Sequence, residues 1–144
     1  LDKQLILPLI PDDMVSRVMI VENDYYNLLS YARLALVTSG TATLETALFK
    51  VPQVVCYKTG SFTYFLAKQL VDLKFISLVN LIAGKEVVKE LIQNDCNPKS
   101  IVDELTRLAS LTEEVHSHFY DDLMKEMGEA GSAKRVAEAL VAMA

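Results

Sequence analysis

The chain has 144 residues, of which 51% are hydrophobic and 23% charged, and this balance excludes a disordered or low-complexity protein. Its net charge of −5 argues against a protein that binds nucleic-acid phosphates, whose basic surface would dominate the sum. Cys56 and Cys96 lie far apart and form no C-x-x-C pair, so a disulfide scaffold and a zinc finger are both disfavoured. One domain in a reducing, cytoplasmic compartment is the simplest interpretation.

In chain order, the first two thirds alternate between short apolar runs and stretches with helical periodicity. Strands are expected at 18–21, 34–37, 53–57 and 75–78, and helices between them at 25–32, 42–50 and 61–71. Pro52 ends the second of these helices and begins a strand, at a position where proline is tolerated. Strands that alternate with helices require a parallel sheet with both faces covered, so the predicted fold class is α/β.

The last third is predicted to be helical. Helices are expected at 86–93, at 99–108 after the capping pair Asn97–Pro98, at 113–127, and from Ser132 onward. Four helices after the last strand predict either a helical tail on the sheet or an arm that docks on a partner domain. We therefore expect a domain over 1–112 and C-terminal helices over 113–144.

No stretch is long and apolar enough to cross a bilayer, and we expect no secretory signal. The first residue is Leu1 instead of Met, from which we expect the chain to be a piece of a longer protein.

The strongest indication of a binding site is Ser39-Gly40-Thr41, between a predicted buried strand and the start of a helix. Parallel sheets bind ligands at the carboxyl ends of their strands, and the first turn of a helix suits a phosphate. Gly40 allows a close approach, and the two hydroxyls add donors. An ordinary helix cap would use the same residues, so this segment alone leaves both readings open.

Glu45 favours a nucleotide. It lies four residues after Thr41, where helical side chains lean back toward the N-terminus, and its spacing does not fit a capping box. Its carboxylate can accept hydrogen bonds from the two hydroxyls of a ribose while a diphosphate lies at the helix end. The alternative is a surface glutamate stabilised by the helix dipole.

Two further segments carry polar groups near predicted strand ends. Asn80 is a lone amide among apolar residues, and it either holds a turn or points into a cleft. Tyr57 and Lys58 close a strand, as edge residues or as the floor of a sugar or phosphate site. His116 and His118 are two apart and make a poor metal pair, so no metal site is predicted.

Several linked segments resemble the lipid-A-disaccharide synthases, namely 38–45 (TSGTATLE), 52–58 (PQVVCYK), 77–84 (SLVNLIAG) and 88–93 (VKELIQ). The resemblance implies a Rossmann-like domain with a helical C-terminal tail, one half of a GT-B glycosyltransferase that needs no metal or cofactor. Such inverting enzymes transfer 2,3-diacylglucosamine from its UDP carrier to 2,3-diacylglucosamine 1-phosphate, and release UDP. Other UDP-sugar glycosyltransferases or epimerases, and a non-catalytic docking module, are the alternatives.

The resemblance also implies roles for individual residues. The diphosphate would contact Ser39, Gly40 and Thr41, and the ribose would contact Glu45. Asn80 would touch the donor near the transferred bond, as the tentative catalytic residue on the donor side, with Tyr57 and Lys58 also in the UDP-sugar site. In this sequence Val79 replaces the family's proline, and Lys85 stands where arginine is common.

Family members are much longer, so we expect an acceptor domain with the general base to be missing here. The chain alone is then expected to be inactive, and the missing domain to make the peripheral contact with the inner face of the inner membrane. An apolar stripe of Val136, Leu140 and Met143 would be exposed without that domain and would favour a homo-oligomer.

Overall fold

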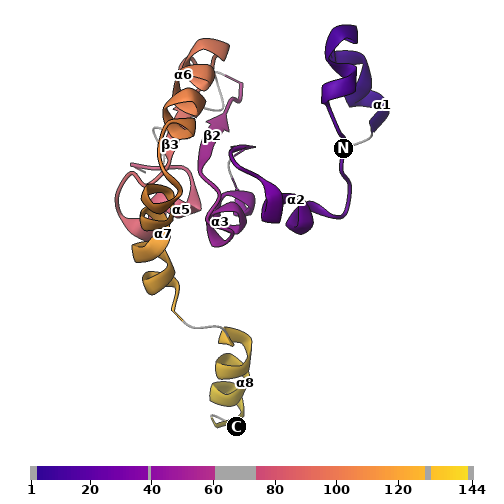
Figure 1. The fold of residues 1–144 in the computed structure, drawn as a ribbon. Coiled ribbons are helices and arrows are strands. Elements are labelled where there is room, and N and C mark those ends of the chain that lie inside the picture. The colour runs from indigo at the N-terminus through magenta and orange to yellow at the C-terminus, as the bar shows by residue number, and fades with distance from the viewer. Residues whose placement is uncertain (1–2, 39, 61–73, 129–130, 143–144) are drawn as a thin grey trace. The chain divides into compact units, whose positions relative to one another are not determined.

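The computed structural model describes residues 3–38, 40–60, 74–128 and 131–142. It divides into two compact units, Leu1–Ala32 and Arg33–Ala144, which are treated separately below. Figure 1 labels the elements along the chain. The first unit contains α1 (Lys3–Ile6), the 3-10 helices η1 (Leu7–Leu9) and η2 (Asp12–Arg17), and α2 (Tyr25–Tyr31).

The first unit confirms the helix predicted at 25–32 but not the strand predicted at 18–21. Asp24 precedes α2, and its carboxylate accepts a hydrogen bond from the side-chain amide of Asn27 at 3.2 Å. Val18 has an extended backbone, yet residues 18–21 pair with no strand in the described part of the chain, and Met19 is 84% exposed. An apolar, extended run forms a strand only where a neighbouring strand takes its backbone hydrogen bonds.

The second unit is a Rossmann-like α/β fold, as the sequence predicts. Its described strands form a parallel sheet in the order β1 (Ala35–Thr38), β2 (Gln53–Tyr57) and β3 (Lys89–Ile92). The strand predicted at 53–57 is confirmed at both ends, and β1 matches 34–37 within one residue. The helix predicted at 42–50 corresponds to α3 (Thr41–Leu48).

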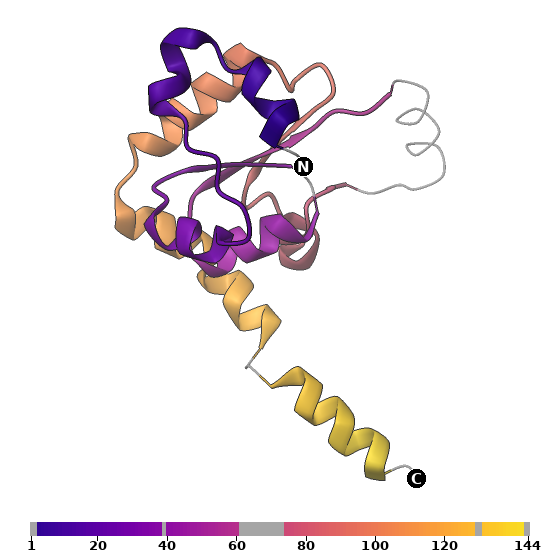
Figure 2. The ribbon, with the colours of Figure 1, turned by 90° about the vertical axis from the view of Figure 1, so that its right-hand side faces the viewer.

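Two clusters of apolar side chains hold the sheet between its helices. Val54 and Val55 are both fully buried on β2 and point to opposite faces, as neighbours on a strand must. On one face, Val54 packs with Leu91 and with Leu108 of α6 (Pro98–Ala109). On the other face, Val55 belongs to a cluster with side chains of α3, α5 (Leu78–Ala83) and α7 (Glu113–Met127). Figure 2 shows α6 on one side of the sheet, with α3, α5 and α7 on the other.

Two predictions in the middle of the chain are wrong. Residues 75–78 are not a strand, because Ser77 caps α5 and the Glu90 carboxylate accepts hydrogen bonds from the Ile76 and Ser77 amides. The helix predicted at 86–93 is instead β3, whose Lys89–Ile92 backbone pairs with β2. The short apolar run fits both the helical period of 3.6 residues and the strand period of two, so only pairing with a neighbouring strand decides between helix and strand. The helix predicted at 61–71 lies outside the described residues.

The C-terminal helices agree with the predicted ranges. Asn97 caps α6 by accepting a hydrogen bond from the Ser100 amide at 3.0 Å, with Pro98 in the first turn. The helix predicted at 113–127 is α7, and α8 (Ser132–Ala142) begins at Ser132. Because β3 replaces a predicted helix, three described helices follow the last strand instead of four.

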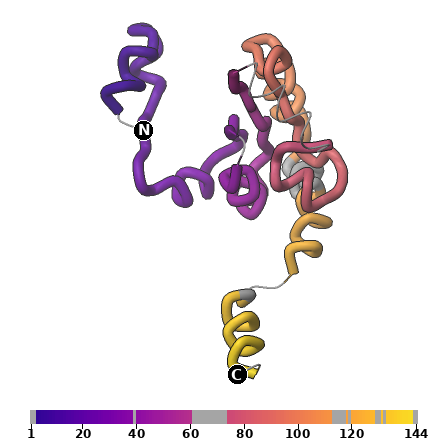
Figure 3. Tube along the Cα trace, turned by 180° about the vertical axis from the view of Figure 1, so that it is seen from behind, coloured from indigo at the N-terminus to yellow at the C-terminus, as the bar shows by residue number. Residues whose placement is uncertain are grey.

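The position of α7 makes it part of the body of the second unit. Tyr120 and Leu123 are buried in the cluster formed with α3 and α5, and Figure 3 shows α7 running beside α5. On α8, by contrast, Val136 and Leu140 are about 60% exposed (59% and 63%). The predicted domain boundary at residue 112 stays a prediction. None of the described helices combines the length and the apolar character needed to cross a membrane.

The buried Tyr120 makes the free energy of unfolding depend on pH in the alkaline range. Its hydroxyl donates to the Val51 carbonyl at 3.0 Å, and burial raises the pKa of Tyr120 to about 12. The unfolded chain ionises this group near pH 10, so the neutral Tyr120 stabilises the fold fully below pH 10. We expect that contribution, about 2–3 kcal/mol, to be lost as the pH rises from about 10 to about 12.

Urea denaturation between pH 8 and pH 11 measures this loss, and Tyr120→Phe provides the comparison. The variant should show a smaller decrease in unfolding free energy above pH 10, because it has no phenol at this site to ionise. An equally steep decrease in both proteins would contradict the assignment to Tyr120.

Candidate functional site at the carboxyl edge of the sheet

The segment after β1 builds a helix start that only glycine suits. Gly40 has φ 137° and ψ −163°, a backbone region essentially restricted to glycine, and α3 begins at the next residue. The Gly40 carbonyl accepts hydrogen bonds from the Thr43 amide at 3.2 Å and the Thr43 hydroxyl at 2.8 Å. Gly40 and Thr41 are both exposed, so the amino-terminal end of α3 is open to solvent. Ser39 lies outside the described residues.

Glu45 lies one turn into α3, on the same side of the helix as Thr41. The buried residues of α3 are Thr43, Thr46 and Ala47, which face the sheet. At 100° per residue, Thr41 and Glu45 fall on the opposite side of the helix, within 40° of each other. Glu45 is half-buried. The helix therefore carries a carboxylate on the face that leads to its exposed N-terminus, as the sequence predicts.

The end of β2 lies beside the start of α3. Thr38, the last residue of β1, is in register with Cys56, so the chain segments after both strands leave the same edge of the sheet. Tyr57 and Lys58 follow directly and are exposed. The structure thus brings Tyr57 and Lys58 to the edge that carries Gly40 and Thr41.

Gln93 fixes the segment after β2, a role that the sequence does not reveal. Its amide donates to the Tyr57 carbonyl at 2.8 Å. Its side chain accepts from the Thr59 amide at 2.9 Å and donates to the Thr59 carbonyl at 3.1 Å. Gln93 adopts a left-handed φ of 52°, at the turn that ends β3. The helix that the sequence predicts at 86–93 would not place Gln93 at the edge of the sheet, whereas β3 does.

Asn80 holds a turn, the first of its two predicted alternatives. Its side chain is fully buried; the carbonyl accepts from the Val87 and Val88 amides at 2.7 and 2.9 Å. The amide nitrogen donates to the Val88 carbonyl at 2.8 Å and to the Glu90 carboxylate at 2.9 Å. These four bonds use the full capacity of an asparagine side chain. The predicted direct contact between Asn80 and a donor sugar stays a prediction.

Glu90 completes this buried network. Besides Asn80, its carboxylate accepts from the amides of Ile76 and Ser77 and, at 2.7 Å, from the Ser77 hydroxyl. The Asn80–Glu90 network therefore joins the start of α5 to the amino-terminal half of β3. The exposed edge at Gly40 and Tyr57 lies at the carboxyl ends of the strands, away from this half of β3.

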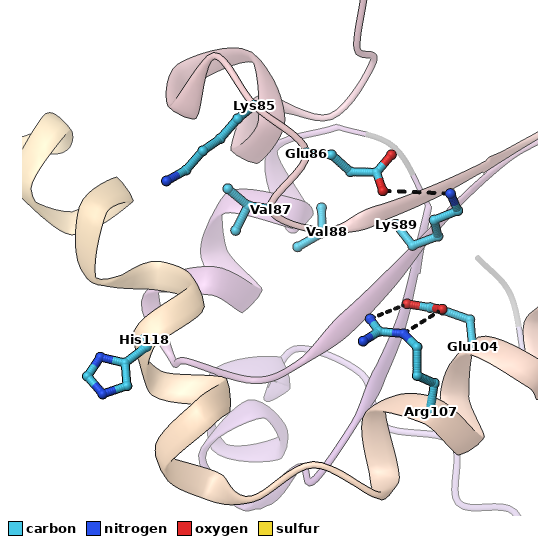
Figure 4. Close-up of a pocket in the computed structure, with 8 residues that line it drawn as sticks. All are labelled: Lys85, Glu86, Val87, Val88, Lys89, Glu104, Arg107 and His118. Carbon is cyan, nitrogen blue, oxygen red and sulfur yellow. Dashed lines mark hydrogen bonds and ion pairs between the residues drawn. The ribbon is translucent and has the colours of Figure 1, made fainter.

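A separate hollow of about 600 Å³ lies at the other end of β3 (Figure 4). Its cations are paired with neighbouring acids: Lys89 with Glu86, and Arg107 with Glu104. Lys85, which also lines the hollow, pairs with Asp122 at 2.8 Å. Such surface pairs contribute little to stability, and none of the predicted site residues that the structure describes lines this hollow.

Known proteins support the resemblance seen in the sequence. A family model described as Lipid-A-disaccharide synthetase matches residues 3–143, nearly the whole chain. The chain belongs to the lipid-A-disaccharide synthetase family. The matched range includes the segments 38–45, 52–58, 77–84 and 88–93, which supply the α3 start, β2, α5 and β3 described above.

Individual relatives within the family carry the name lipid-A-disaccharide synthase. The protein of Persephonella marina is 40% identical over 116 residues, which cover 78% of this chain and 30% of that protein. The protein of Salmonella paratyphi A is 46% identical over 93 residues (65% of this chain, 24% of that protein). That of Sulfurihydrogenibium sp. is 36% identical over 118 residues (79% and 30%). The chain therefore spans less than a third of each of these relatives.

Proposed function

We propose that this chain forms the donor-nucleotide part of an inverting glycosyltransferase of lipid A biosynthesis. The reaction transfers 2,3-diacylglucosamine from UDP-2,3-diacylglucosamine to 2,3-diacylglucosamine 1-phosphate, and gives lipid A disaccharide 1-phosphate and UDP. One observation carries the proposal. The exposed start of α3, with Gly40 in a glycine-only conformation and Glu45 one turn behind it, lies beside Tyr57 and Lys58 at the carboxyl edge of a parallel sheet.

Each group at this edge has a chemical role in the proposal. The first-turn amides of α3, with Ser39, Gly40 and Thr41, bind the diphosphate through hydrogen bonds and the partial positive charge of the helix. Glu45 accepts hydrogen bonds from the ribose hydroxyls. Lys58 attracts the donor's negative charge, and Tyr57 offers a ring and a hydroxyl to the uracil or the sugar. UDP, which leaves with the diphosphate charge, is thereby stabilised without a metal or cofactor.

The rest of the reaction belongs to the longer protein. We propose that a second, acceptor-binding domain supplies the general base and contacts the inner face of the inner membrane, where the lipid substrates lie. This chain alone then binds UDP weakly and does not catalyse transfer. In the longer protein Asn80 remains our candidate for the donor-side residue near the transferred bond; in this chain it holds the turn between α5 and β3 through the Asn80–Glu90 network.

A titration with UDP tests the donor site, with ADP as the control nucleotide. In backbone amide NMR spectra of this chain, UDP should cause saturable shifts at Gly40, Thr41 and Glu45 and at Tyr57–Lys58, whereas ADP should not. Glu45→Ala should weaken UDP binding by about 10- to 100-fold, through loss of a charge-assisted hydrogen bond of about 1.5–3 kcal/mol.

Glu126→Ala is the matched control, because Glu126 is an exposed glutamate on α7. It should leave UDP affinity unchanged. If Glu45→Ala bound UDP as well as the unmodified chain but unfolded more easily, Glu45 would be a helix-stabilising residue. The absence of shifts at millimolar UDP, together with tight self-association, would favour a docking module instead.

A further inference from the structure

Cys56 and Cys96, which are 40 positions apart in the sequence, pack against the same apolar cluster in the folded chain. Cys56 is the fourth residue of β2, in register with Leu91 of β3. After β3 the chain turns back, with the Asp95 amide bonded to the Ile92 carbonyl and the Cys96 amide to the Gln93 carbonyl. This turn brings Cys96 over the same face of the sheet as Cys56.

The two thiols share one environment. Both side chains pack against the cluster of Val54, Leu91 and Leu108, between the sheet and α6. The thiol of Cys96 lies close enough to Cys56 to contribute to the raised pKa of Cys56. Both cysteines are free thiols and only partly buried, so small reagents can reach them. The fold therefore contains a pair of adjacent thiols that the spacing of the sequence does not predict.

We propose that Cys56 and Cys96 are a redox modification site, at which a low-molecular-weight disulfide such as oxidised glutathione converts the two thiols into an intramolecular disulfide. The cross-link joins the end of β2 to the turn before α6. It is independent of the proposed function, because it needs only the contact between the two side chains.

The reaction proceeds by two exchanges. The Cys96 thiolate attacks one sulfur of oxidised glutathione, forms a mixed disulfide and releases one glutathione thiolate. Cys56 then gives its proton to solvent, and its sulfur attacks Cys96 of the mixed disulfide, which forms the Cys56–Cys96 bond and releases the second glutathione. Two protein thiols are oxidised, and one glutathione disulfide is reduced to two thiols.

The order of attack follows from the setting of Cys56. Burial, together with the neighbouring thiol of Cys96, raises the pKa of Cys56 to about 11, so Cys56 is protonated at neutral pH and makes a poor first nucleophile. Once Cys96 carries glutathione, the adjacent Cys56 is held beside the bond it must attack. Proximity then favours the second exchange over the capture of another molecule.

The experiment is oxidation of the purified chain with excess oxidised glutathione at neutral pH, followed by mass spectrometry and non-reducing tryptic mapping. We expect a monomer lighter by two hydrogens, and a linked pair of the tryptic peptides 51–58 and 90–99, which hold the two cysteines. Dithiothreitol should reverse the change. Oxidation should raise the midpoint of thermal unfolding by about 10 °C, because the bond closes a long loop of the unfolded chain.

Single-cysteine variants separate the two steps. Cys56→Ser should accumulate a stable glutathione adduct on Cys96, since no second thiol is present to displace it. Cys96→Ser should react slowly and form no internal link. The proposal is overturned if the unmodified chain retains glutathione on its cysteines, or forms only cross-linked dimers, without the linked peptide pair. That map of the unmodified chain decides the matter even if a variant fails to fold.

Discussion

Asn80→Ala is expected to lower the free energy of unfolding by about 3–4 kcal/mol, a large loss for a single polar residue. The alanine would leave the amides of Val87 and Val88 and the carbonyl of Val88 without their side-chain partner inside the protein. It would also remove one of the donors that surround the Glu90 carboxylate. Buried groups that lose a partner cost more than the bond was worth, because no water replaces it. Urea denaturation followed by circular dichroism measures the effect.

Asn94→Ala is the matched control for this variant. Asn94 carries the same side chain but is exposed in the turn after β3, so its replacement should change the free energy of unfolding by about 0.5 kcal/mol or less. Suppose instead that Asn80→Ala kept its stability, while the same change abolished sugar transfer in the longer protein. Asn80 would then act on the donor, and its buried bonds would be secondary.

Leu123→Ala should cost about 3–4 kcal/mol of unfolding free energy, because it opens a cavity where α7 meets α3 and α5. Leu123 is fully buried in the cluster that also holds Val55 and Tyr120. The loss would show that α7 belongs to the cooperative core of the second unit. Thermal unfolding followed by circular dichroism, together with urea denaturation, provides the measurement.

The adjacent Met124 offers a control on the same helix. Its side chain is 37% exposed, so Met124→Ala removes contacts without opening an enclosed cavity, and it should cost less than about 1 kcal/mol. Equal, small effects of both substitutions would mean that α7 folds and unfolds apart from the sheet.

The sequence predicts best the elements whose ends carry local signals. Pro52 sets the start of β2, and Asn97–Pro98 sets the start of α6, because capping and proline geometry depend only on neighbouring residues. The four-residue spacing of apolar residues in 113–127 suffices for α7. Such signals need no knowledge of what the element packs against.

The errors arise where a distant partner decides the structure. Within the predicted helix 86–93, residues 89–92 become a strand only because β2 offers a free edge, and residues 18–21 have no such edge in the described chain. Residues 75–78 form no strand because the Ile76 and Ser77 amides donate to the carboxylate of Glu90, which lies more than ten positions away. The hydrophobic pattern of a short segment carries no information about such distant partners.

The candidate site likewise contains residues that local sequence reveals and residues that only distant contacts reveal. Gly40, Thr41 and Glu45 can be recognised from the sequence because they share one turn of a helix, a local relation. The role of Gln93, and the contact between Cys56 and Cys96, depend on the parallel pairing of β2 with β3. A single sequence does not specify that pairing until β3 is known to be a strand.

The central strand β2 has one more consequence. Val54 packs in the cluster beneath α6, and Val55 packs in the cluster beneath α3, α5 and α7. The two apolar layers on opposite faces of the sheet therefore share a single backbone segment. Loosening either layer displaces the strand on which the other depends. We therefore expect the centre of the second unit to open in one step, so that the amide hydrogens of residues 53–57 exchange with solvent only when both layers unfold.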